Sequence, residues 1–82
     1  MYEDLASAPS RVIGVKQTVR ALERGVVSAV YVARDAEERV VRELKALALA
    51  KGIPVTPVES MDELGKVCGI DVGAAAAAIL HE

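Results

Sequence analysis

Cationic and amide side chains gather directly after an early glycine. Lys16, Gln17 and Arg20 follow Gly14 within six residues. Because the first N–H groups of a helix have no partner inside it, a helix that begins here presents donors to anions or acceptor atoms. Gln17 adds an amide, and the two cations can reach phosphates or guanine acceptors. The pattern favours a nucleic-acid ligand, although a solvated cationic helix face is the commoner use of such spacing.

A second candidate is the glycine-flanked loop at residues 69–73, which holds Ile70, Asp71 and Val72. Two interpretations stand side by side. The β-branched side chains of Ile70 and Val72 pack into the core, or they form an exposed apolar ledge on which an unstacked base can rest. The residues alone favour neither interpretation.

Residues for catalysis are scarce. His81 is the only histidine and lies near the chain end, where fraying is commoner than catalysis. Cys68 is the only cysteine, so it forms no intrachain disulfide or Cys-based metal site and is expected to be a packing thiol. Neither a G-x-G-x-x-G motif nor a phosphate loop occurs. We therefore expect no catalytic residue, metal site, cofactor or small-molecule substrate.

Charge is distributed unevenly along the chain. The net charge is −2, and the segment from residue 35 onward has five basic and nine acidic residues. The segment at residues 11–34 has one acidic residue, Glu23, and five basic ones: Arg11, Lys16, Arg20, Arg24 and Arg34. We expect a basic patch on an acidic body. Because the only aromatic residues are two tyrosines, an RNA partner has to be recognised by shape and helix ends rather than by base stacking.

Alternating strands and helices must position these residues. In chain order the expected elements are a short helix that ends near Pro9, a strand at 11–13, a helix that ends at Gly25, a buried strand at 28–33, a helix that ends at Gly52, a strand at 53–58 that is near an edge or short, a helix that ends at Gly69, and a strand at 74–80. The first long helix is expected to bury a stripe of Val15, Val19, Leu22 and Val26.

Two capping boxes are expected to start the later helices. Asp35 pairs with Glu38, and Ser60 pairs with Glu63. The final alanine-rich segment favours a helix by propensity, but small side chains suit a central strand between helix layers, so we predict a strand. The alternation predicts a single domain over residues 1–82, an α/β three-layer α/β/α sandwich. No apolar run is long enough for a membrane span and no signal peptide is evident, so we expect a cytoplasmic monomer with no membrane partner.

Two longer segments carry a family resemblance. They are Gly14-Val15-Lys16-Gln17-Thr18-Val19-Arg20 and Leu64-Gly65-Lys66-Val67-Cys68-Gly69-Ile70-Asp71-Val72-Gly73-Ala74-Ala75. In order and spacing they resemble the signature segments of the kink-turn-binding ribosomal protein family typified by the archaeal "L-seven-Ae" protein, and most of all its short bacterial YbxF-type members. The resemblance runs nearly from end to end.

The resemblance implies a four-stranded mixed sheet and binding to a sharply bent RNA. Gly14, Lys16, Gln17 and Arg20 would contact the tandem sheared G·A pairs, while the loop at residues 70–72 would abut the bulged nucleotides. We add Arg34 to the expected RNA-binding residues because of its place in the basic set. The predicted function is non-catalytic binding of kink-turn RNA, in the ribosome or in a regulatory element. The alternative is a protein-interaction module that uses the acidic face after Asp35.

Overall fold

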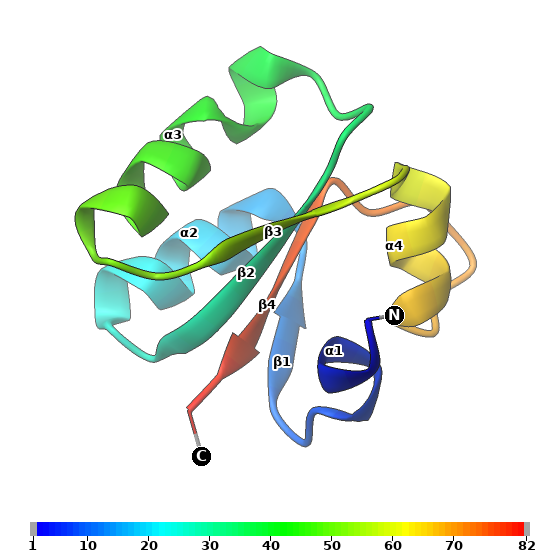
Figure 1. Cartoon of the computed structure of the whole chain (residues 1–82), viewed down its shortest axis with the longest axis horizontal. Coiled ribbons are helices and arrows are strands. Elements are labelled where there is room, and N and C mark those ends of the chain that lie inside the picture. Colours follow the sequence, from blue (N-terminus) through cyan, green and yellow to red (C-terminus); the bar gives the residue numbers. More distant parts are fainter. Residues whose placement is uncertain (1, 82) are drawn as a thin grey trace.

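Helices and strands alternate through the chain (Figure 1), and the computed structural model describes residues 2–81. The elements in chain order are α1 (Glu3–Ser7), β1 (Arg11–Ile13), α2 (Val15–Arg24), β2 (Val27–Ala33), α3 (Glu38–Ala50), β3 (Val55–Val58), α4 (Met61–Val67) and β4 (Ala76–Leu80). Every element expected from the sequence is present, with bounds shifted by a few residues. None of the helices in the described residues is both long and apolar enough to cross a membrane.

The four strands form one mixed sheet in the order β1-β4-β2-β3. Strand β4 pairs antiparallel with both β1 and β2, and β2 pairs parallel with β3. Because of these directions, β1, β2 and β3 end at the same edge of the sheet where β4 begins. The connections that leave or enter the strands at this edge hold all the residues expected to bind RNA.

Helices cover both faces of the sheet (Figure 1). On one face, α2 and α3 contribute Leu22 and Leu44 to the core, and on the other face α1 and α4 contribute Leu5 and Leu64. All four leucines are essentially inaccessible to solvent. The predicted α/β/α sandwich with a four-stranded mixed sheet is therefore confirmed.

The alanine-rich segment is a strand at the centre of the sheet, as predicted. Ala76, Ala77 and Ala78 are fully buried. Ala76 and Ala78 face the layer of α2 and α3, whereas Ala77 faces the layer of α1 and α4. Burial between two helix layers outweighs the helix propensity of alanine here, because side chains of successive strand residues point to opposite faces and both faces are covered.

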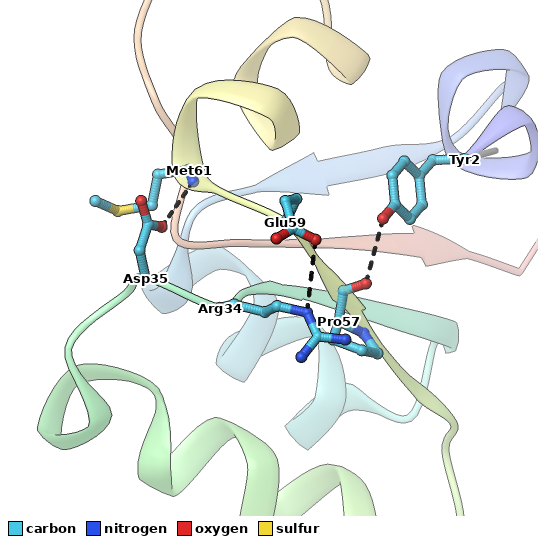
Figure 2. A network of polar contacts seen from close by, with 6 residues as sticks. All are labelled: Tyr2, Arg34, Asp35, Pro57, Glu59 and Met61. Carbon is cyan, nitrogen blue, oxygen red and sulfur yellow. Dashed lines mark hydrogen bonds and ion pairs between the residues drawn. The ribbon is translucent and has the colours of Figure 1, made fainter.

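Of the two predicted capping boxes, the N-cap bond of one is observed and the other is wrong. The Ser60 hydroxyl accepts a hydrogen bond from the backbone N–H of Glu63 at 3.0 Å, which starts α4 as expected. Helix α3 instead begins at Glu38 and, within residues 2–81, has no side-chain cap. The Asp35 carboxylate accepts from the backbone N–H of Met61 at 2.8 Å and so caps α4 (Figure 2). The turn after β2 therefore directs the Asp35 carboxylate toward α4, which is distant in sequence, and not toward α3.

The predicted apolar stripe of α2 is only partly correct. Leu22 is buried, but Val15 and Val19 are only half-buried, and Val26 lies beyond the helix end. The other buried residues of α2 are Thr18 and Ala21. All three valines pack against the core while partly exposed, and Val15 and Val19 line a groove that Glu43 of α3 also borders. Gly25 ends the helix with φ 74°, a left-handed conformation that suits glycine.

Candidate functional site

The segments expected to bind RNA meet at the sheet edge where β4 begins. The N–H of Gly14 donates to the carbonyl of Ala76 at 2.8 Å, and the N–H of Ala33 donates to Ala75 at 2.9 Å. The loop at residues 70–72 is followed by these same two residues, of which Ala76 is the first of β4. The start of α2, the end of β2 and this loop are therefore fastened to one short segment of backbone.

The start of α2 is open to a ligand. Gly14 precedes the helix with φ 110°, a conformation that L side chains rarely adopt, and no side-chain cap bonds the helix within the described part of the chain. Lys16, Gln17 and Arg20 are all exposed. The Gln17 amide folds back over Gly14, since a Cβ added to Gly14 would lie 2.5 Å from Gln17 Oε1. The N–H groups of the helix start and the Gln17 amide therefore lie together at Gly14.

Thr18 lies among these residues but points inward. Its side chain is fully buried, and its hydroxyl oxygen has no hydrogen-bond partner among residues 2–81. A buried hydroxyl without a partner costs about 1–3 kcal/mol. The burial of Thr18 was not predicted, because a threonine between Gln17 and Val19 carries no local sign of burial.

In the loop before β4, core packing and exposure, the two interpretations left open from the sequence, each apply to a different residue. Val72 is 70% exposed and Asp71 is exposed as well, whereas Ile70 is half-buried against the core of α1 and α4. Two backbone bonds hold the loop on α4, from Ile70 N–H to Gly65 O and from Ala74 N–H to Met61 O, both 3.0 Å. Val72 is therefore presented to solvent on an anchored loop, and Ile70 is part of the anchor.

Arg11 lies away from the other cations of the basic segment. It is the first residue of β1, and its guanidinium donates to the carbonyls of Leu5 (2.9 Å), Ala6 (3.1 Å) and Cys68 (2.9 Å). These carbonyls belong to the final turns of α1 and α4. Arg11 therefore joins two helix ends to the sheet, and the expected basic patch has one cation fewer.

Arg34 follows β2 at the site edge. Its Nε lies 4.0 Å from Glu59 Oε2, with the two side chains 61% and 82% exposed (Figure 2). An ion pair this exposed is worth little and leaves the arginine available to a ligand. Acidic side chains also lie beside the cations of α2. Lys16 and Arg20 line a groove of about 280 Å³ together with Glu23 and Glu43. Glu43 comes from α3 and was not predicted as a neighbour of the site.

The single cysteine lies in the core. Cys68 is buried, and burial raises the pKa of its thiol, while the nearby Arg11 guanidinium opposes that rise. A thiol held protonated in the core is a packing group, as predicted. Within the described residues, no group of three or more side chains suited to a metal ion is present.

Comparisons with known proteins identify relatives over nearly the whole chain. The family described as Ribosomal protein L7Ae/L30e/S12e/Gadd45 matches residues 3–82. An RNA-binding protein of Halalkalibacterium halodurans is 53% identical over 95% of both chains. The RNA-binding protein YbxF of Geobacillus stearothermophilus is 49% identical over 98% of both chains. The large ribosomal subunit protein eL8 of Halobacterium salinarum is 47% identical over 82% of this chain and 57% of its own.

The fold has solved counterparts. The Giardia lamblia 15.5kD RNA binding protein superposes with a TM-score of 0.86 and 26% identity, over 98% of this chain and 68% of that one. The relatives include both kinds of protein that the signature segments resembled, the archaeal ribosomal protein and the short YbxF type. The resemblance stated from the sequence is therefore confirmed.

Proposed function

Because the chain belongs to the ribosomal protein L7Ae/L30e/S12e/Gadd45 family, we propose that it recognises kink-turn motifs in structured RNA. At the level of its relatives, the chain is an RNA-binding protein and not an enzyme. The kink-turn, the eight contact residues and a monomeric, cytoplasmic state are the further steps of the proposal. The relation to a ribosomal subunit protein favours ribosomal RNA as a target, with a regulatory RNA as the alternative.

The observation that carries the proposal is that the α2 start and the loop at residues 70–72 meet where β4 begins. A regular A-form duplex keeps its base edges in a deep, narrow groove that side chains cannot read. A kink at sheared G·A pairs opens that groove and unstacks neighbouring bases. An exposed helix start beside an exposed apolar side chain, Val72, fits both parts of such an RNA at once.

The contact residues divide by chemistry. Gln17 and the free N–H groups after Gly14 would bond to base edges of the G·A pairs. Lys16, Arg20 and Arg34 would contact phosphates or guanine acceptors, and all three are exposed. Ile70 fixes the loop on which Asp71 and Val72 would meet the bulged nucleotides.

Charge argues for recognition by geometry. The chain carries a net charge of −2, and Arg11 is occupied by backbone carbonyls inside the protein. Few cations remain to attract RNA of any shape, and the acidic body repels straight duplex. We therefore expect most of the discrimination to come from fit at the helix start and loop.

Titration of a kink-turn duplex against the same duplex with its G·A pairs replaced tests the proposal. We expect the intact motif to bind much more tightly, and we expect Gln17→Ala to lose most of that difference. Arg24→Ala is the matched control, since Arg24 is exposed in the last turn of α2, two turns from the helix start. Equal affinity for both RNAs, or no binding, would contradict the proposal and favour a protein-interaction module that uses the acidic face.

A further inference from the structure

Helix α4 has a glycine at its centre. Gly65 is buried within the seven-residue helix Met61–Val67, although glycine is a poor helix former compared with alanine. A Cβ at Gly65 would collide with the carbonyl oxygen of Val72, and it would lie 3.1 Å from Val72 C and 3.2 Å from Gly73 Cα. The backbone of the loop therefore rests on the helix at the position where the helix has no side chain.

The contact between loop and helix is reciprocal. A Cβ at Gly73 would lie 3.2 Å from Met61 Cβ and 3.3 Å from Met61 C. The hydrogen bonds from Ile70 to Gly65 and from Ala74 to Met61 bracket this contact. The gap that Gly65 leaves in the helix surface is called the notch here. The backbone of Val72 lies in this notch, and Val72 remains 70% exposed. The notch at Gly65 thus fixes how far the apolar ledge stands from α4.

Helix α4 is in turn located by Asp35. The Asp35 carboxylate accepts from the N–H of Met61 at 2.8 Å, across 26 positions of sequence (Figure 2). Asp35 directly follows Arg34 at the end of β2. A carboxylate at a helix N-terminus is favoured by the free N–H groups and the helix dipole. Through this bond, the helix that bears the loop is held against the sheet edge to which the α2 start is also fastened.

We propose that Gly65 and Asp35 are positioning residues for RNA recognition. Neither is assigned a contact with RNA; together they set the place of Val72 relative to the start of α2, and with it the discrimination between kinked and straight RNA. This inference rests on the proposed function, because it concerns the same RNA site.

Gly65→Ala tests the notch, with Gly52→Ala as the matched control. Gly52 has φ 70°, and a Cβ there meets nothing within 4 Å in the described part of the chain, so its substitution strains the backbone without moving the loop. We expect both variants to lower the thermal midpoint. Gly65→Ala should weaken kink-turn binding about tenfold, the size of one lost base contact, whereas Gly52→Ala should stay within about twofold.

A double-mutant cycle separates positioning from general loosening. Val72→Ala should weaken binding about fivefold in the unchanged protein but much less in the Gly65→Ala background, because the ledge is already displaced there. Independent effects that simply multiply would overturn the role of Gly65. The coupling is a difference between RNA dissociation constants, and thermal melting curves do not contain it. The cycle therefore reports on the position of the loop and not on stability.

Asp35 supplies a second, milder variant in case Gly65→Ala folds poorly. Asp35→Asn keeps an acceptor oxygen and should retain discrimination, while Asp35→Ala should lose several-fold in affinity for the kinked RNA even though it removes a negative charge near the site. Unchanged affinity of Asp35→Ala would overturn the role of Asp35. Failure of the unchanged protein to distinguish kinked from straight duplex would instead reject the proposed function itself.

Discussion

Replacement of Arg11 by methionine tests whether Arg11 stabilises the fold, as its contacts indicate, or binds RNA, as the charge pattern of the sequence indicated. The guanidinium makes three hydrogen bonds to carbonyls at the ends of α1 and α4. Bonds from a charged donor contribute about 1.5–3 kcal/mol each, but Arg11 is partly exposed and the three bonds share one donor group, so we expect a combined loss of about 2–4 kcal/mol. At about 4–8 °C per kcal/mol for a domain of this size, the thermal midpoint should fall by about 8–32 °C.

The assay is thermal unfolding together with RNA titration at fixed salt, below the midpoint of the variant. Methionine keeps an apolar stem of similar length, so the change reports on the lost bonds. The dissociation constant should stay within about twofold because Arg11 lies at the start of β1, away from the site. Arg24→Met is the control, with a stability loss of only about 0.3–1 kcal/mol through the helix dipole. A tenfold loss of RNA affinity by Arg11→Met at an unchanged midpoint would refute the reasoning and return Arg11 to the basic patch.

Other predictions concern the site and the core. Gln17→Ala should weaken kink-turn binding by about 1–3 kcal/mol with unchanged folding, and an unaltered dissociation constant would remove Gln17 from the site. Val72→Asp should impair RNA binding far more than thermal stability because Val72 is 70% exposed; a large fall in the midpoint would speak against the ledge. The slope of log affinity against log salt should lie near −2 to −4, and a slope of −6 or steeper would mean that bulk electrostatics dominates. Burial raises the pKa of the Cys68 thiol, so the unfolded thiol ionises first and the free energy of unfolding falls as pH rises past about 8.5; Cys68→Ala should flatten that fall between pH 8 and 10.

Local patterns were sufficient to predict most of the fold. Glycines at the ends of α2 and α4 and the β-branched residues of β2 each act over a few residues, so they can be interpreted without knowledge of the tertiary structure. The errors concern side chains whose partners are distant in sequence. Asp35 bonds to Met61 rather than capping the nearer helix α3, and Arg11 bonds to Cys68 57 positions away. No periodicity or spacing encodes such a partner.

The candidate site shows the same division. The helix start and the glycine-flanked loop were visible as motifs, and the exposure of Val72 agrees with one of the two interpretations left open for it. The acidic neighbour Glu43 was not predicted, because it comes from α3. Gly65 could have been suspected, since a glycine inside an otherwise regular helix often marks a close approach of backbone. What approaches it is decided only when α4 and the loop pack together.

The central position of β4 in the sheet has a consequence for folding during translation. Strands β1 and β2 do not pair with each other; each pairs with β4, which comes last of the four described strands in chain order. At roughly 5–20 residues per second, β2 is made several seconds before residue 80. Until then the nascent chain has no continuous sheet, and the N–H of Gly14 has no Ala76 carbonyl to meet. The start of α2 and the loop at residues 70–72 are therefore joined in the proposed RNA site only after β4 has been synthesised.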